Sequence, residues 1–376
     1  MEMKKVVRYL DIKPLYDDLF VVSDPIGICD DFIVNKMTLL LMFLFDGNRS
    51  DEEVRSEFIK RIGIFITEEQ FKEIIEFFEK NGLFLDENLK IIKGRKIEEL
   101  KKQGYISSYF SNDGIDLQDF IRFLRIDEVS GGNFDAAIVP HIDLRVGINS
   151  YVKAYDTLRS DRKRVFIFGV SHYFHEGLFS VCPLDWETPF GFVYTDKEAV
   201  VKITEKFSLD MYSNLLSYRK EHSIAFHLPY VKRLMEKARV VAILVGMSDN
   251  LKESKKRIEE FAYFIANNFP DSVFISSIDL SHVGNKFGDE KLEDPEEVDK
   301  EYINFLLSAD AEGAFEFLLN NENKTRIDGI LTNYLFLKTI NFLKKERIDA
   351  KLLDYQKYFE KPTNSLVSFC SIVYDL

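Results

Sequence analysis

Histidine is the residue type whose positions in this chain most clearly indicate chemistry. All six histidines of the 376-residue sequence lie between His141 and His282. Three of them closely follow apolar runs: AIVP precedes His141, RVFIFGVS precedes His172, and SVFISSIDLS precedes His282. We interpret each run as a buried strand because its apolar residues are continuous. Residues beyond the carboxyl ends of parallel strands meet at one edge of a sheet, so we expect these imidazoles to share a cleft.

Carboxylates and two further histidines accompany these three residues. Asp143 and Asp279 are close in sequence to two of them, and imidazole with carboxylate is a ligand set that suits first-row metals. Glu221 and His222 form an adjacent acid–imidazole pair suited to proton transfer. His227 is expected to pack or hydrogen-bond beneath the site. The pattern predicts a metal-binding or catalytic cluster; the alternative is a set of histidines that only cap strand ends.

Other kinds of site have less support in the sequence. Ser171 precedes a histidine, but its surroundings, GVSHY, depart from the GxSxG nucleophile elbow at the last position. The three cysteines are far apart and have no CxxC spacing, which is typical of a reducing compartment and argues against a disulfide framework. The segment ETPFG around Thr188 predicts a rigid hairpin turn or, alternatively, a wall of the cleft.

Composition narrows the choice of partners and compartment. The formal net charge of -13 repels phosphate backbones and anionic membranes, so nucleic acid and membrane are not expected partners. The first residues lack the apolar core of a signal peptide. The longest apolar run, 37–45, is far shorter than the roughly 20 residues that span a bilayer. We therefore expect a cytoplasmic protein.

The elements that must position the histidines lie in the second of two predicted domains. Residues 1–95 read as a small winged-helix-like α+β domain, with helices followed by a short hairpin after Leu83. Residues 96–133 read as a connector that ends at a Ser-Gly-Gly-Asn sequence. Residues 134–376 predict an α/β domain with a mainly parallel central sheet and helices on both faces.

The motifs of the second domain, in their order, resemble the Memo family, the protein B component of the AmmeMemoRadiSam system in bacteria and archaea. They are Pro140-His141, GVSH at 169–172, ETPFG at 187–191, EHSI at 221–224, HLP at 227–229, LVG at 244–246 and SSIDLSH at 276–282. The resemblance covers about residues 134–376. It implies a fold similar to that of the class III extradiol dioxygenases, which hold a non-haem iron in a histidine-lined cleft.

The resemblance also implies roles for individual residues. His141 and His172 match the first two metal-site positions, and His222 matches the acid/base histidine of the dioxygenases. Ser281 stands where the animal members carry a metal-site cysteine. A serine hydroxyl is a poor ligand for soft metals, so Asp279 or His282 is left to complete the site.

A second departure lies near the carboxyl end of the chain. Asp328-Gly329 stands where many family members have Cys-Gly. For this reason the redox properties of the animal proteins are not carried over to this chain.

The function that follows is a metal-dependent redox or dioxygenase-like enzyme, with iron or copper favoured over zinc. A metal-dependent hydrolase and a non-catalytic module that binds a peptide or partner are the alternatives. The family resemblance implies a radical-SAM protein and an AMMECR1-domain-type protein as partners. The first domain weakly resembles the small peptide-binding domains of radical-SAM maturation enzymes, which implies a peptide ligand; a generic helical domain that packs on its neighbour is the alternative.

Overall fold

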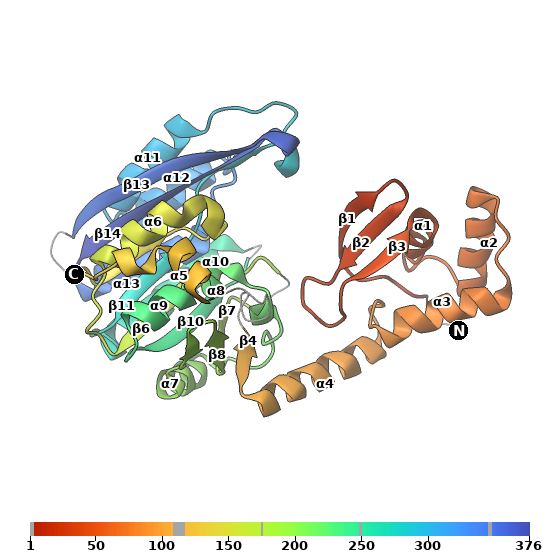
Figure 1. Cartoon of the computed structure of the whole chain (residues 1–376), viewed down its shortest axis with the longest axis horizontal. Helices are drawn as coiled ribbons and strands as arrows, with labels where there is room; N and C mark the ends of the chain where they lie inside the picture. The colour runs from red at the N-terminus through yellow and green to blue at the C-terminus, as the bar shows by residue number, and fades with distance from the viewer. Residues whose placement is uncertain (1–3, 108–116, 174–175, 248–249, 345–347) are drawn as a thin grey trace. The chain divides into compact units, whose positions relative to one another are not determined.

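The computed structural model describes residues 4–107, 117–173, 176–247, 250–344 and 348–376 (Figure 1). His175 lies outside these ranges. The chain divides into two compact units, Met1–Gly104 and Tyr105–Leu376. Within the described ranges, no helix combines the length and apolarity that a bilayer crossing requires.

The first unit is a three-stranded antiparallel sheet followed by helices. Its elements are β1 (Asp11–Tyr16), β2 (Leu19–Ser23), β3 (Phe32–Asn35), α1 (Lys36–Leu44), α2 (Asp51–Ile62), α3 (Glu68–Lys80) and α4 (Glu87–Gln103). Capping boxes begin α2 at Ser50 and α3 at Thr67. In each, the cap side chain accepts a hydrogen bond from the N3 amide, and the N3 side chain accepts one from the backbone amide of the cap residue. The small α+β unit is therefore as predicted.

The order of elements in this unit differs from the prediction. The hairpin expected after Leu83 is absent from the described residues there; Asp86 instead caps α4, which continues through the predicted boundary at residue 95. The antiparallel strands precede the helices, and residue 84 contributes only a bridge to Val7. The error has a physical cause, since a segment with a good N-cap and many helix-forming residues continues as helix.

The second unit is built on an eight-stranded sheet. The strand order is β12-β14-β5-β11-β6-β10-β7, with β13 paired to β14. The bounds are β5 (Ala136–Val139), β6 (Arg164–Val170), β7 (Phe179–Val181), β10 (Arg239–Val245), β11 (Val273–Ser277), β12 (His282–Gly284), β13 (Asp349–Glu360) and β14 (Ser365–Asp375). The four central strands β5, β11, β6 and β10 are parallel, and the strands that flank them are antiparallel.

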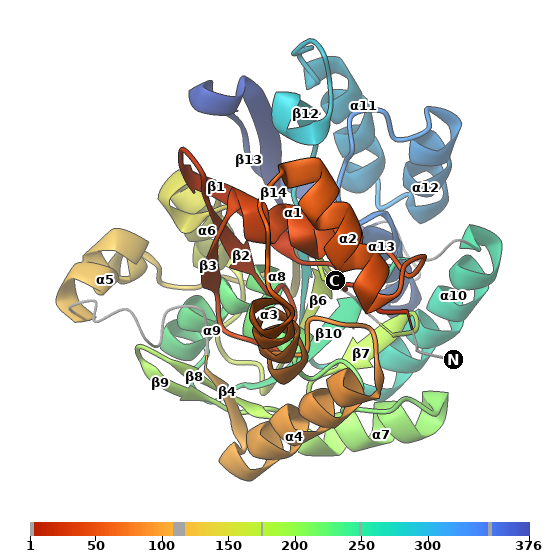
Figure 2. The same cartoon turned by 90° about the vertical axis from the view of Figure 1, so that its right-hand side faces the viewer.

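Helices cover both faces of this sheet, as the continuous apolar strands predict (Figure 2). One face carries α6 (Leu144–Thr157) against β5 and β14, and α8 (His222–Ala225) against β6. The other face carries α13 (Ile330–Leu343) against β11 and β6, with α10 (Leu251–Asn268) packed on α13. Phe166 and Phe274 anchor the core beneath α10 and α13, with stacked rings whose centroids lie 5.4 Å apart.

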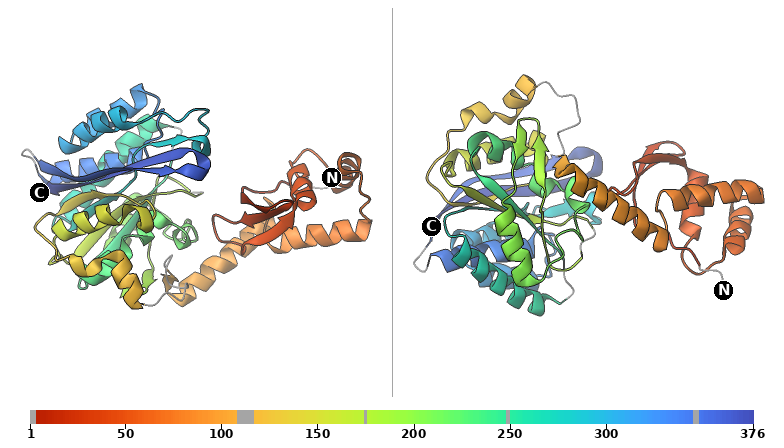
Figure 3. Two further views of the ribbon diagram at one scale, coloured as in Figure 1. Left: turned by 45° about the horizontal axis from the view of Figure 1, so that its top comes forward. Right: turned by 90° about the horizontal axis from the view of Figure 1, so that it is seen from below.

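The remaining elements complete the second unit. They are β4 (Tyr105–Ser107), α5 (Leu117–Leu124), β8 (Asp185–Thr188), β9 (Gly191–Val193), α7 (Lys197–Phe207), α9 (Leu228–Leu234), α11 (Glu296–Leu307) and α12 (Ala311–Asn320). The long β13–β14 ribbon is visible in Figure 3. β4 pairs with β8, so part of the predicted connector 96–133 is built into the second unit.

Candidate metal centre

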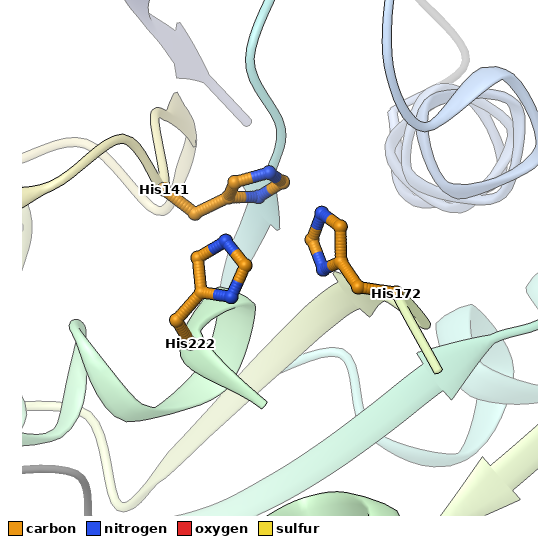
Figure 4. A group of neighbouring side chains, drawn as sticks. All are labelled: His141, His172 and His222. Atoms are coloured by element: carbon orange, nitrogen blue, oxygen red, sulfur yellow. The ribbon is translucent and has the colours of Figure 1, made fainter. Parts of the chain in front are cut away.

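Three histidines converge where the central strands end (Figure 4). His141 follows β5, His172 follows β6, and His222 is the first residue of α8. One ring nitrogen from each lies within 4.8 Å of the others. The rings of His172 and His222 stack with centroids 4.3 Å apart, and the ring of His141 meets both edge-on. Such a cluster of imidazoles can hold a metal ion.

A glycine in β6 allows α8 to bring His222 to this place. A Cβ atom at Gly169 would lie 2.6 Å from Oγ of Ser223 and 2.7 Å from Cδ1 of Ile224. Ser223 fixes the approach by donating its hydroxyl to the carbonyl of Val170 at 2.8 Å. The GVSH and EHSI segments therefore form one structural feature, although they are far apart in the sequence.

Hydrogen bonds define which nitrogen of two imidazoles is free. Nδ1 of His141 lies 3.1 Å from the carbonyl oxygen of Ser277, and Nδ1 of His172 lies 2.8 Å from Oε1 of Glu221. Both oxygens accept only, so each Nδ1 carries a hydrogen. In the neutral tautomer each Nε2 then presents a lone pair, which is the form that binds a metal.

A carboxylate outside the predicted ligand set faces both of these nitrogens. Oδ2 of Asp328 lies 2.9 Å from Nε2 of His141 and 3.7 Å from Nε2 of His172. This oxygen is buried and has no hydrogen-bond partner of good geometry among the residues described. Oδ1 is occupied, because it accepts the amide of Gly329 at 2.7 Å, just before α13.

The donor set around Oδ2 fits a cation. Two imidazole lone pairs and one carboxylate oxygen converge on a buried point, and a buried polar atom without a partner is costly. A metal ion or a proton placed between these atoms would remove the repulsion between their lone pairs. The sequence signal for this residue was the Asp328-Gly329 pair, a departure from the resemblance described above, and it places a carboxylate oxygen at the cluster.

Charge interactions tune the cluster. Burial opposes protonation of His172, but Glu221 and Asp328 outweigh it and hold the pKa of His172 well above its usual value. Burial likewise opposes ionisation of Glu221, yet His172 lowers its pKa to about 2. Burial also works against ionisation of Asp328, but His141 and His172 hold its pKa well below the usual range. The carboxylates are therefore ionised at neutral pH.

His222 differs from the other two histidines in its charge. Burial, reinforced by His172 and His141, lowers the pKa of His222 to about 3. Its imidazole is consequently neutral at physiological pH. Nδ1 lies 3.7 Å from Oε1 of Glu221, an arrangement that favours a hydrogen on Nδ1 and leaves Nε2 as a proton acceptor.

Two carboxylates of the predicted set fix the backbone beside the cluster. Oδ1 of Asp279 accepts the amides of His141 and Ile142 at 3.0 and 3.1 Å, and its Oδ2 lies 3.9 Å from Nε2 of His141. Burial raises the pKa of Asp279. Asp143 lies at the start of α6, where it accepts the amide and side chain of Arg145.

Other residues predicted for the site lie elsewhere, and the proposed ligand set is corrected accordingly. His282 is not part of the cluster: its Nδ1 faces the carbonyls of Leu280 and Arg326, because residues 282–284 turn into β12 and pair with β14. Ser281 donates its hydroxyl to Asp299 at 2.6 Å. Thr188 stabilises the β8–β9 turn by donating to the carbonyl of Gly191.

His227 lies beneath the cluster, buried and without a role as a ligand. Its Nε2 contacts Oγ of Ser277 at 2.8 Å, and its Nδ1 contacts the hydroxyl of Tyr155 at 3.0 Å. Burial lowers the pKa of His227 to about 3. Both ring nitrogens are thus occupied by hydroxyl groups.

The fold and this cluster together define a class: an α/β protein with a metal-competent histidine site at the carboxyl ends of a mainly parallel sheet. The chain belongs to the Memo family, because the family model described as Memo-like protein matches residues 106–373. A MEMO1 family protein of Aquifex aeolicus is 36% identical over 99% of this chain and 100% of its own length.

Two relatives of lower identity also bear MEMO1 in their names. A MEMO1 family protein of Thermus thermophilus is 27% identical over 86% of this chain and 99% of its own length. Protein MEMO1 of Xenopus laevis is 28% identical over 40% of this chain and 52% of its own length. The crystal structure of an uncharacterized Escherichia coli K12 protein aligns with 64% of this chain and 99% of its own, at 14% identity and a TM-score of 0.40.

Proposed function

We propose that the second unit is a metal-dependent redox enzyme of dioxygenase-like chemistry, with iron held by His141, His172 and Asp328. The observation that carries the proposal is the position of Asp328 Oδ2, which faces Nε2 of both histidines and lacks a well-aligned hydrogen-bond partner among the described residues. Two histidines and one carboxylate, with further positions open, are typical of non-haem iron(II) oxygenases.

The choice of iron rests on the ligand types. The thiolate and thioether ligands that select copper(I) are missing from the group of ligating residues found in the described ranges. Catalytic zinc sites share imidazole and carboxylate ligands and also keep an open position. The ligand types therefore favour iron(II) over copper(I), and we choose iron over zinc because two histidines with one carboxylate are the ligand set of the non-haem iron(II) oxygenases.

In this proposal, residues of the chain orient the ligand rings and accept a proton from the substrate. Bound iron would supply one-electron redox chemistry and open positions for small ligands. Glu221 holds the Nδ1 hydrogen of His172, and Ser277 holds that of His141, so that both rings keep Nε2 directed at Asp328. His222, neutral at physiological pH, is placed to accept a proton from a substrate group at Nε2.

A metal-free role is supported by one observation. Protons on His172 and His141 would also relieve the repulsion, since neighbouring carboxylates raise the pKa of both. In that case the cluster would be a structural part of a binding module, and the peptide, radical-SAM and AMMECR1-domain-type partners would be the ligands to test. A hydrolase that uses metal-bound water is the chemical variant of the metal site.

Metal analysis separates these functions. Untagged protein purified without chelator should contain close to one equivalent of iron. His141→Ala and Asp328→Ala should lose it, while His282→Ala, a histidine at the same sheet but outside the cluster, should retain it. Equal metal content in all three variants would remove the proposed site.

A further inference from the structure

A chain of hydrogen bonds leads from the histidine cluster into the core. Oγ of Ser277 lies 3.4 Å from Nδ1 of His141 and 2.8 Å from Nε2 of His227. Nδ1 of His227 lies 3.0 Å from the hydroxyl of Tyr155. Each of these four residues is almost completely buried. The proposed metal ligand His141 is thus linked to one particular phenol.

Tyr155 belongs to a stack of three buried tyrosines. Its ring lies 4.7 Å from that of Tyr230 at an interplanar angle of 8°, and Tyr230 lies 5.8 Å from Tyr151 at 5°. All three side chains are fully buried. Packing of apolar surface explains why the three rings stack. It does not explain why their three hydroxyls have different kinds of hydrogen-bond partner.

Only one hydroxyl of the stack meets a base. Tyr151 donates to the carbonyl of Ile142 at 3.1 Å, and Tyr230 donates to the carbonyl of Leu124 at 3.0 Å. A peptide carbonyl cannot take up a proton, whereas a neutral imidazole can. In the tautomer that carries its hydrogen on Nε2, beside Oγ of Ser277, Nδ1 of His227 is the proton acceptor that this stack contacts among the described residues.

We infer that Tyr155 is a one-electron donor to the metal centre and that His227 accepts its proton. Oxidation removes one electron from the phenol, the O–H bond breaks, and an N–H bond forms at Nδ1 of His227. The electron would pass to an oxidised metal ion held by His141, His172 and Asp328, which would act as the one-electron oxidant. The products are a neutral tyrosyl radical and an imidazolium, and re-reduction returns the proton to Tyr155. The inference rests on the proposed redox function.

Physical chemistry favours Tyr155 over its neighbours. An oxidised phenol that kept its proton would be a buried cation, which the apolar core penalises strongly. Transfer of the proton along the hydrogen bond to His227 leaves the phenol ring neutral and moves the positive charge to the imidazole. Burial holds the pKa of Tyr151 and Tyr155 well above the usual value, so neither is a phenolate before oxidation. His227 is neutral at pH 7 because burial lowers its pKa.

The test is electron paramagnetic resonance of frozen protein after one-electron oxidation. One sample is loaded with iron(II) and treated with hydrogen peroxide; another is stripped by chelator and photo-oxidised with a ruthenium–bipyridine complex and an electron acceptor. The long-lived tyrosyl signal should be lost in Tyr155→Phe and reduced severalfold in His227→Gln. It should persist in Tyr151→Phe, which removes a phenol of equal burial whose hydroxyl meets a carbonyl.

The two samples keep this inference separate from the metal site. The photo-oxidised sample contains no metal, so a signal that depends on Tyr155 there supports the relay even if iron loading fails. A signal in Tyr155→Phe as strong as that of the wild type would overturn it. So would loss of the signal in Tyr151→Phe with its full retention in Tyr155→Phe. Thermal unfolding of each variant shows that the fold is retained.

Discussion

Asp328 Oδ2 lies 2.9 Å from Nε2 of His141, although one residue precedes α13 and the other follows β5. The contact joins a helix on one face of the sheet to the carboxyl end of a central strand. It supplies the one oxygen of the cluster that is buried without a well-aligned hydrogen-bond partner among the described residues of the site.

Replacing Asp328 with cysteine should change the preference for metals. A thiolate keeps the negative charge but is a soft ligand, so the relative affinity should shift from iron(II) toward copper(I). Competition between the two ions, followed by metal analysis, measures the shift. Asp328→Asn, which keeps the shape and removes the charge, is the control and should weaken binding of both ions. An unchanged preference in the cysteine variant would show that Asp328 is not a ligand.

Glu221→Gln should weaken metal binding although it leaves all the proposed ligands in place. The carboxylate holds Nδ1 of His172 at 2.8 Å and the His172 amide at 3.0 Å. Removal of such a partner typically costs about 10–100-fold in metal affinity. Titration against a chromophoric chelator gives the affinity, with the exposed Glu297→Gln as control. Wild-type affinity in Glu221→Gln would argue against a role for His172 as a ligand.

Gly329→Ala should displace Asp328. The glycine has φ of +62°, and an added Cβ would lie 2.4 Å from Cγ2 of Ile278. The backbone that carries Asp328 must move, so metal content and thermal stability should both fall. Gly288→Ala is the matched control, since Gly288 also has a positive φ, of +89°, but nothing lies within 4 Å of the added atom. It should lose some stability and keep its metal.

Acidification should destabilise the chelator-treated protein below pH 6.5. Burial lowers the pKa of His227 in the folded protein to about 3, from its usual value of about 6.5. As the pH falls through 6.5, His227 becomes protonated in the unfolded chain but stays neutral in the folded protein. The free energy of unfolding therefore decreases. Such a group contributes a slope of about 1.4 kcal/mol per pH unit.

Urea unfolding at pH 7, 6 and 5 provides the measurement, with wild type and His227→Gln compared. His222, whose pKa is also about 3, acts in the same direction. Glu221 adds to the loss only below pH 4.5, because its folded pKa is about 2 and its stabilisation disappears as the pH falls toward that value. The His227→Gln variant should therefore show a shallower slope between pH 6.5 and 5. Identical slopes in the two proteins would contradict a depressed pKa at His227.

Local sequence patterns predicted the parallel strands because continuous apolar runs leave few other choices. The same patterns placed His141 and His172 at one edge of the sheet, where the structure also has them. They failed for His282, because the segment after β11 does not continue outward but turns back to pair with β14. Periodicity contains no information about that return.

The third and fourth groups of the cluster depend on helix placement. His222 reaches the site because Gly169 allows α8 to approach β6, and Asp328 reaches it because α13 begins beside β11. Both contacts are tertiary and join distant segments. In the first unit, the hairpin predicted after Leu83 is replaced by helix for a local reason, since Asp86 caps α4 and the residues that follow continue as helix.

Anomalous scattering from crystals grown anaerobically with iron(II) tests the metal site most directly. The account predicts a single strong peak at the iron absorption edge, bonded to Nε2 of His141, Nε2 of His172 and a carboxylate oxygen of Asp328. A cluster without a peak, or iron bound at His282 and Ser281 instead, would contradict it.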